Sequence, residues 1–370
     1  MRILAAFCLL ASTALLACPA QARMWIISRD GSRDAPTIQA GIDSAAVGDS
    51  VILEGGTWHV HDINMKSGIL LSGITGILET PNPEYTVIDA DGQGRCVNCI
   101  DLTAASAIKA LTFRDGIAPL VPAYNIQAGG AMYVSNSPLT ITNCAFVNNH
   151  SDAFSGAIFS DYSTISLENC SFEHNSAGVG GGALGIDGDI DNATVMNCTF
   201  LENSATWRGG AVSAHSVTLT GCLFIRNKAE EYGADVSCDY ATITNCTFVS
   251  AGNFQIAIWG GRLSLSKTIF ANCGIRGTAY ECAVSATCCD FYPNSGFANC
   301  EDWRSPDCFS LDPQFCDAGA DNYALEQSSP CAPGNAPGGY NCGLIGARPV
   351  GCQSTAVEAT TWGRLKAMFR

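Results

Sequence analysis

Two aspartates and a histidine occupy equivalent places in three successive segments of the chain. Each is the fourth residue after the alanine of an SGA or GGA step, and the three are Asp161, Asp187 and His215. If the segments stack as neighbouring strands, these side chains start about 5 Å apart at the backbone. Carboxylates that close raise one another's pKa or bind a cation, and such a pair can act as acid and nucleophile, or as acid and base, on a glycosidic bond. Asp161, Asp187 and His215 are therefore candidate catalytic residues.

Two aromatic residues lie on the same predicted face. Tyr133 and Phe159 take the second place after the alanine, and side chains two apart on a strand share a face. The first place is apolar, and therefore predicted to be inward, and it holds Met132, Ile158, Leu184 and Val212. Exposed aromatic rings stack on sugar rings, so Tyr133 and Phe159 are candidate substrate-binding residues. The same pattern also fits an ordinary solvated outer face.

A short acidic segment spaces three carboxylates two residues apart. They are Asp187, Asp189 and Asp191, and alternate oxygens of this kind converge on one hard cation in calcium loops. The twelfth position, where an EF-hand needs glutamate, is Cys198, which excludes that motif. A nonstandard surface calcium site is one interpretation and a solvated acidic turn is the other.

Two further patterns resemble metal or redox sites only in part. His59 and His61 alternate on one strand-like segment, which suits either a metal site or an ordinary surface. Cys96 and Cys99 form a single CxxC pattern, and a zinc site would need a second pair. We therefore expect a local disulfide or two free thiols there.

A repeat identifies the elements that must position all these residues. Phenylalanines recur at intervals of 26, 28, 24, 24 and 22 residues, at Phe146, Phe172, Phe200, Phe224, Phe248 and Phe270. Each unit consists of short apolar runs between Gly and Asn turns, without helical periodicity. Such a period is typical of a solenoid whose units stack to share a core. The sequence therefore predicts an all-β solenoid with its phenylalanines pointing inward.

Cysteine and asparagine columns accompany the phenylalanines. The cysteines are Cys144, Cys170, Cys198, Cys222 and Cys246. Stacked side chains point in parallel, which makes the disulfide dihedral difficult, and cysteine is readily buried, so we expect inward free thiols. The asparagines are Asn143, Asn169, Asn197 and Asn245, with a second set at Asn149, Asn175, Asn203 and Asn227. Their amides are expected at turns, where each can hydrogen-bond the next.

The ends of the solenoid differ from its repeats. Residues 36–47 have Pro36 at a suitable first helical position and Ile38 and Ile42 four apart, which predicts a short amphipathic helix. We expect this helix to cover the first coil, because unpaired strand edges promote polymerisation.

The domain boundaries follow from composition. One β-helix domain is expected over residues 34–352, with regular repeats over about 129–273. Residues 282–352 contain nine cysteines and predict a disulfide-linked C-terminal cap. The tail, 353–370, changes from acidic to basic and is a candidate sorting element.

The N-terminus and the composition indicate export. Residues 1–22 have one basic residue, an apolar stretch and a small-residue ending, as secretory signal peptides do. A competing interpretation is a lipoprotein signal with lipidation at Cys18. The 20 cysteines fit an oxidising compartment. A net charge of −15 argues against a nucleic-acid partner. We expect a monomer without a transmembrane span in the mature chain.

A family resemblance rests on these motifs. The opening TIQAGIDSAAVGDSVILEGGTW and the later VIDADGQG resemble the start of the pectin-lyase-like right-handed parallel β-helix superfamily. The GGA and FxxN repeats resemble those of polymorphic outer membrane proteins and other bacterial β-helix proteins. The resemblance covers roughly residues 34–350 and implies the fold. It implies no single activity, because the superfamily includes lyases, polygalacturonases, esterases, adhesins and proteins without known activity.

The functional expectation follows from these observations. We expect an exported, bacterial-type surface or secreted protein with a structural, adhesive or glycan-binding role and no catalysis. Its expected partner is a polysaccharide or a cell-surface glycan, and no cofactor is expected other than calcium at the acidic segment. The alternative is a polysaccharide lyase or glycoside hydrolase acting on an extended polysaccharide, neutral or acidic. No lysine or arginine aligns with the Asp161 column, as a lyase would need.

Overall fold

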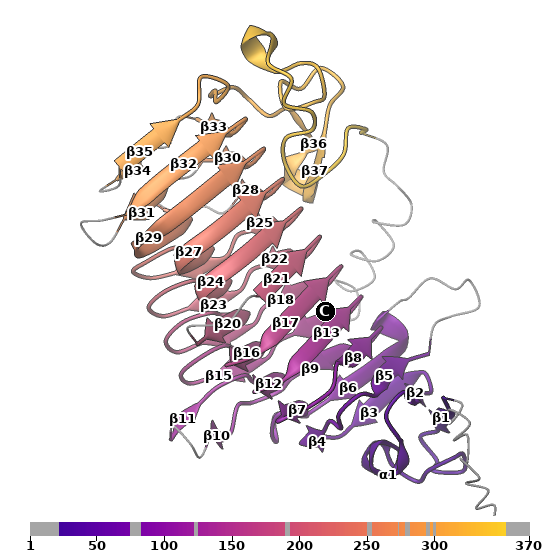
Figure 1. Ribbon diagram of the computed structural model, residues 1–370. Helices are drawn as coiled ribbons and strands as arrows, with labels where there is room; N and C mark the ends of the chain where they lie inside the picture. The colour runs from indigo at the N-terminus through magenta and orange to yellow at the C-terminus, as the bar shows by residue number, and fades with distance from the viewer. Residues whose placement is uncertain are drawn as a thin grey trace, which may run out of the picture.

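The computed structural model describes residues 22–74, 83–121, 125–188, 193–249, 254–272, 274–277, 282–293, 297–298 and 301–352. The chain winds into a right-handed β-helix that runs from the helix α1 at one end to a loop-rich cap at the other (Figure 1). The predicted all-β solenoid is therefore confirmed. The signal segment with Cys18 and the tail 353–370 lie outside the described residues.

The largest sheet has 19 strands, all paired in parallel, and is built from two rows. The first row contains β4 (Ile63–Asn64), β7 (Val97–Ile100), β12 (Met132–Ser135), β16 (Ile158–Asp161), β20 (Leu184–Asp187), β31 (Ile275–Gly277) and β34 (Phe297–Ala298). The second row contains β1 (Met24–Ile27), β2 (Ser50–Leu53), β5 (Leu70–Gly73), β8 (Ser106–Lys109), β13 (Pro138–Thr142), β17 (Thr164–Glu168), β21 (Ala193–Met196), β32 (Ala283–Thr287) and β35 (Glu301–Arg304). Three long strands run through both rows and join them: β24 (Val212–Thr220), β27 (Val236–Thr244) and β29 (Ile256–Ser266).

Two smaller parallel sheets complete the coils. The ten-stranded sheet contains β3 (Gly56–His59), β6 (Thr86–Asp89), β9 (Thr112–Arg114), β14 (Ala145–Val147), β18 (Ser171–Glu173), β22 (Thr199–Leu201), β25 (Leu223–Ile225), β28 (Thr247–Val249), β30 (Ile269–Ala271) and β33 (Asp290–Tyr292). The four-stranded sheet contains β15 (His150–Ser151), β19 (Ser176–Ala177), β23 (Ser204–Ala205) and β26 (Lys228–Ala229). A 3-10 turn, η1 (Pro83–Tyr85), precedes β6.

The phenylalanine column forms the centre of the core. Phe146, Phe172 and Phe200 lie in register on β14, β18 and β22, and their side chains are 0% exposed. The column extends on both sides of them and stacks with ring centroids between 4.6 and 5.3 Å apart. Offset stacking of aromatic rings at such spacing adds to the stabilisation from burial. The predicted inward column is confirmed.

The second asparagine column is a buried hydrogen-bonded ladder. The side-chain amide of Asn149 donates to Asn175 Oδ1 (2.9 Å), Asn175 donates to Asn203 (2.9 Å), and Asn203 donates to Asn227 (3.0 Å). Each amide also donates to the main-chain carbonyl of a phenylalanine in the preceding coil. Every turn is thereby tied to its neighbours, since buried polar groups must find partners. The structural role predicted for these amides is confirmed.

The ladder cysteines are buried free thiols, as predicted. They are Cys144, Cys170, Cys198, Cys222 and Cys246, and Cys96 and Cys99 are also free and buried. Burial raises the pKa of the Cys144 and Cys246 thiols well above the ordinary value. Such thiols are unreactive, because the thiolate is the nucleophile.

The N-terminal end is covered by α1 (Ile38–Ser44). Ile38, Gly41 and Ile42 are the buried residues of this helix, and Gly41 packs closely on Ile27, since an added Cβ would lie 2.6 Å from Ile27 Cδ1. Thr37 is the N-cap and accepts a hydrogen bond from the Ala40 amide. The predicted covering helix is thus present, but Pro36 precedes the cap instead of taking the first helical position.

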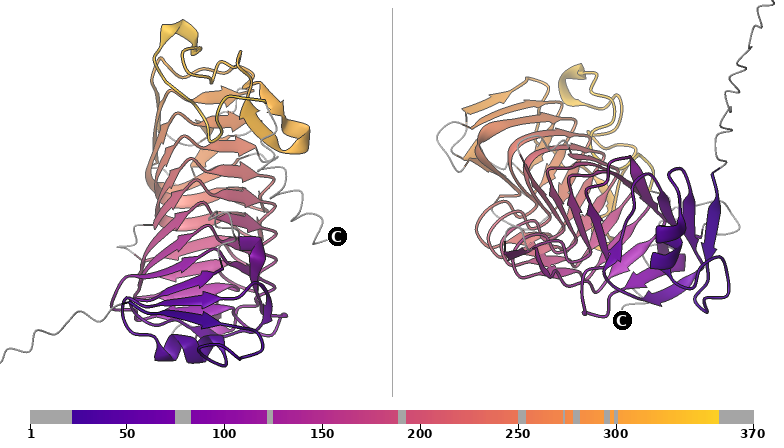
Figure 2. Two further views of the ribbon diagram at one scale, coloured as in Figure 1. Left: turned by 90° about the vertical axis from the view of Figure 1, so that its right-hand side faces the viewer. Right: turned by 60° about the horizontal axis from the view of Figure 1, so that its bottom comes forward.

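The C-terminal region combines further coils with an irregular segment. Strands of the solenoid continue past residue 282 as far as Arg304. The remainder contains the antiparallel pair β36 (Phe315–Asp317) and β37 (Asn322–Leu325), with the short turns η2 (Ala318–Ala320) and η3 (Pro337–Gly339). This segment also lies along one side of the last coils (Figure 2).

The side contact covers the outer face of the ten-stranded sheet. Leu223 and Ile225 flank the inward Phe224 and therefore face outward, where they pack with Tyr323. In the preceding coil of the same sheet, Thr199 Oγ1 accepts a hydrogen bond from the Arg348 guanidinium (3.1 Å). The cap is therefore a clamp on several coils, and not only a cover for the last one.

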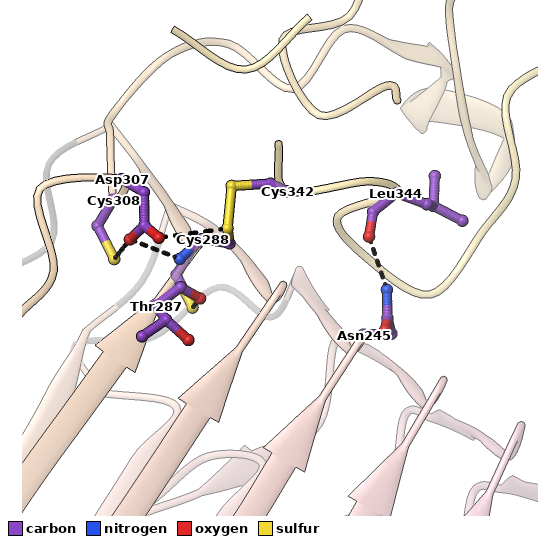
Figure 3. Close-up of a disulfide and its surroundings, with 8 residues drawn as sticks. Asn245, Thr287, Cys288, Asp307, Cys308, Cys342 and Leu344 are labelled. Atoms are coloured by element: carbon purple, nitrogen blue, oxygen red, sulfur yellow. Dashed lines mark hydrogen bonds between the residues drawn. A yellow bond between two sulfur atoms is a disulfide. The ribbon is translucent and has the colours of Figure 1, made fainter. Parts of the chain in front are cut away.

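Disulfides fix this cap. Cys288–Cys342 joins the end of β32 to the returning chain, and the Asn245 amide donates to Leu344 O (2.8 Å) nearby (Figure 3). Cys316–Cys352 closes a second loop. These two bridges, which join described residues, lie within residues 282–352, while the ladder thiols stay free, which agrees with the predicted distribution.

Candidate functional site

The register of the predicted site is as expected. Ser135, Asp161 and Asp187 are in-register neighbours on β12, β16 and β20. The first place after each alanine is fully buried, at Met132, Ile158, Leu184 and Val212. Asp161 and Asp187 therefore do point away from the solenoid core, but their surroundings differ.

A hairpin covers the N-terminal part of this face. It consists of β10 (Leu120–Val121) and β11 (Ile126–Gln127). Beneath it Tyr133 and Phe159 are only 5% and 4% exposed, and they form a second apolar cluster with Val121. Their rings stack on each other at 6.1 Å. The prediction that these rings face solvent is wrong, because a local insertion before the GGA step folds over them.

Asp161 is buried beside the Tyr133 ring. It is 4% exposed, and its Oδ2 accepts hydrogen bonds from Tyr133 Oη (3.3 Å) and Ser135 Oγ (3.4 Å). Burial is the main cause that raises the pKa of Tyr133, and the adjacent carboxylate contributes. The carboxylate is thus engaged in local hydrogen bonds, and the expectation that Asp161 lies on an exposed catalytic face is wrong.

Asp187 lies on the exposed part of the face. It ends β20, where it is exposed to solvent. Asp189 and Asp191 lie outside the described residues, so the calcium hypothesis remains a prediction.

His215 has a partner that sequence reasoning missed. Its Nδ1 lies 2.8 Å from Asp239 Oδ2, and the two side chains are 34% and 35% exposed. The Tyr240 ring meets the imidazole edge-on at 5.5 Å. Asp239 follows His215 by 24 residues, the interval that also separates Phe224 from Phe248, so the repeat itself contained the signal. The described contacts of His215 are with this next coil and not with Asp187.

An open groove lies beside this pair, on the outer face of the second row. Its volume is about 670 Å³, and its lining comes from β24, β27, β29 and β32. Ser216, Tyr240 and Arg262 stand in register across three strands. A second register contains hydroxyl side chains only: Thr218, Thr242, Ser264 and Ser285. Since parallel strands lie about 4.8 Å apart, the groove presents equivalent hydroxyls at regular steps.

The groove follows an irregularity in the long strands. The register of β27 and β29 shifts between Cys238 and Tyr240, where β29 carries extra residues. Gly261 fits there because an added Cβ would lie 1.8 Å from Asp239 O. Bulges of this kind redirect side chains and occur beside functional sites. The sequence prediction compared only the four residues that follow the alanine of each step. Tyr240 and Arg262 lie outside that window, so they were not predicted as site residues.

The remaining candidate patterns have structural partners. His59 Nδ1 lies 2.8 Å from Asp91 Oδ2, and the two can approach a shared metal position with Asp89. Asp89, however, already pairs with Arg114. His61 contacts Asp62 at 2.7 Å. Within the described part of the chain, no helix has the length and apolar character needed to cross a membrane.

A comparison with protein families agrees with the fold. A family model described as a right handed beta helix region matches residues 86–275. A solved structure, the Family 28 exopolygalacturonase of Yersinia enterocolitica, is 10% identical, with 79% of this chain and 78% of that chain covered at a TM-score of 0.22. No curated protein matches the sequence. The family model spans more than half of the sequence, and the chain belongs to the family of right-handed β-helix proteins.

Proposed function

We propose that this protein binds an extended glycan in the groove of the second row. The observation that carries the proposal is the combination, in one groove, of a hydroxyl register with the partly exposed ring of Tyr240 and the exposed Arg262. Hydroxyl and guanidinium groups exchange hydrogen bonds with sugar hydroxyls, and an aromatic ring packs against the apolar face of a sugar. A groove along stacked strands suits a polymer whose units repeat.

The proposed setting is the cell surface or the extracellular space. The sequence of residues 1–22 supports export. Disulfides in the cap are also typical of an oxidising compartment. A structural or adhesive role is consistent with glycan binding, since both need a stable surface that holds a polymer without changing it.

Hydrolysis or lysis of the glycan is the second candidate, and the His215–Asp239 pair favours it. Asp239 holds Nδ1 of the imidazole, which leaves Nε2 without a hydrogen-bond partner among the described residues. A histidine held this way is suited to act as a general base or acid. Its position beside Tyr240 places it at the edge of the groove.

The test measures binding and turnover on the same samples. Purified protein is titrated with neutral and acidic polysaccharides, and new reducing or unsaturated ends are assayed. We expect binding without product, and at least tenfold weaker binding for Tyr240→Ala with Arg262→Ala. Tyr85→Ala, which removes an exposed tyrosine elsewhere, should bind like the parent. Product that disappears in His215→Ala would establish the enzymatic alternative, and no binding to any polysaccharide would refute both.

A further inference from the structure

An aromatic and arginine cluster lies on the first row, beyond the His215–Asp239 pair. It consists of Trp207, Arg208, Tyr232, Trp259 and Arg276, and we call it the arginine cluster. The Trp259 ring lies edge-on to Trp207 (5.7 Å) and to Tyr232 (5.0 Å). Trp207 is 37% exposed and the other four side chains are partly exposed. The cluster is therefore a surface feature and not part of the core.

The fold positions these side chains from successive coils. Arg208 and Tyr232 each immediately precede a glycine step and are bridged to each other in parallel. Trp259 ends the first part of β29, and its Nε1 donates to Ser237 Oγ on β27 (2.7 Å). Arg276 belongs to β31, the following strand of the first row. Regular stacking thus brings together residues separated by up to 69 positions in the sequence.

Both arginines rest on rings, and among the described residues neither has an acidic partner. The Arg208 guanidinium lies 5.0 Å from the Trp207 ring and 5.6 Å from the Trp259 ring, and Arg276 lies 5.6 Å from Tyr232. Neither forms a salt bridge with any described carboxylate, in a chain with 34 acidic and 19 basic residues. Arg208 Nε is buried without a hydrogen-bond partner among the described residues. A buried donor in this state destabilises the protein unless a ligand satisfies it.

The chemistry of the cluster favours a ligand that carries an anionic group next to a ring or another apolar surface. Stacking on rings holds a guanidinium in place while its edge remains a planar fork of donors. A carboxylate matches this fork with two parallel hydrogen bonds. Tyr232 and Trp259 supply ring faces and edges against which a sugar can pack. A sugar ring that carries a carboxylate offers both features in one unit.

We propose that the arginine cluster is a subsite for a uronate unit of the glycan held by this protein. The inference rests on the proposed glycan-binding function and specifies its ligand class as an acidic polysaccharide. Trp259 of the cluster and Arg262 of the groove belong to the same strand, on either side of the bulge at Gly261. One polymer can therefore contact both. Nucleic acid is disfavoured, since two arginines in a chain of net charge −15 offer few phosphate contacts.

The experiment compares each acidic polymer with its own neutral form. The probes are oligomers of polygalacturonate, alginate and hyaluronate, each with its fully methyl-esterified counterpart, together with dextran sulfate and single-stranded DNA. Isothermal titration at low and moderate salt gives the affinities. We expect at least one uronate oligomer to bind ten times or more tightly than its ester, and than dextran sulfate or DNA.

The variants separate this subsite from the groove. Arg208→Gln with Arg276→Gln should remove the preference for acid over ester, and Arg208→Lys should weaken it because the fork is lost. Arg33→Gln, an exposed arginine without a described partner, is the matched control and should keep the preference. Thermal unfolding of each variant checks that the fold is intact.

Failure of this inference differs from failure of the proposed function. Equal binding of acid and ester by the parent, or a preference that survives in the double variant, overturns the uronate subsite and leaves glycan binding standing. Tighter binding of dextran sulfate or DNA also overturns it. A parent that binds none of these glycans, and none of the neutral and acidic polysaccharides of the first test, overturns both proposals.

Discussion

At the scale of single residues, position in the coil decides what a side chain can do. Asp161 and Asp187 share a register, yet one is buried and the other is exposed. Phe200, by contrast, stacks between two identical residues, Phe172 and Phe224. The sequence predicted the role of Phe200 because a repeated residue needs a repeated environment. It did not predict the burial of Asp161, which bonds to Tyr133, a ring packed against the non-repeated hairpin.

Truncating the phenylalanine column should be costly. Phe200→Ala removes a fully buried ring that stacks on Phe172 and Phe224, and we expect the free energy of unfolding to fall by roughly 3–5 kcal/mol. Denaturant titration measures this. Thr242→Ala, on the exposed side of β27, should change it by less than about 0.5 kcal/mol. A Phe200→Ala effect as small as that of the control would contradict the stacked core.

Asp290 should make stability depend on pH. Burial raises the pKa of Asp290 from 3.8 to about 7, although the Leu311 amide and the Cys331 thiol donate to it. The folded state therefore keeps a proton that the unfolded state loses. Its stabilisation is complete below about pH 4 and disappears as the pH rises through about 7.

The isosteric Asp290→Asn variant tests this directly. Relative to the parent it should gain stability between pH 4 and pH 7, by up to about 4 kcal/mol, because it has no proton to lose. Urea unfolding at intervals across this range gives the curve for each protein. Parallel curves for the two proteins would show that Asp290 does not titrate in this window.

At the scale of elements, insertions and the cap modify a regular solenoid. The hairpin β10–β11 closes one part of the outer face, and the bulge in β29 opens another. Both lie where the repeat is interrupted, so alignment of repeats could not locate them. The cap was predicted from its cysteines, but its contact with the ten-stranded sheet comes from Tyr323 and Arg348, whose types carry no such signal.

Removing the Cys288–Cys342 bridge should loosen this clamp. The bridge closes a loop with a sequence separation of 54, so its loss should lower the free energy of unfolding by roughly 4 kcal/mol on the chain-entropy estimate. Cys288→Ser with Cys342→Ser should also increase hydrogen exchange at Gly346 and Ala347, whose amides donate to Lys267 O and Thr247 Oγ1. Faster exchange in the coils around Phe172 instead would show that the bridge acts elsewhere.

At the scale of the whole molecule, a stable stack of coils presents one long outer face. The hairpin covers side chains of β12 and β16, and farther along the solenoid the arginine cluster and the groove share β29. The overall fold was predictable, because the residues that repeat with its period are residues that must be buried. The site was predictable only as a face, since its open part depends on a bulge and on single aromatic and arginine residues.

A crystal structure with a bound uronate oligosaccharide would show directly where this protein holds a glycan. We predict sugar density in the groove, with one ring against Tyr240 and hydroxyls bonded to Thr218, Thr242 or Arg262, and a carboxylate near Arg208. Sugar bound only elsewhere, such as at Asp187 or on the cap, would contradict glycan binding in the groove.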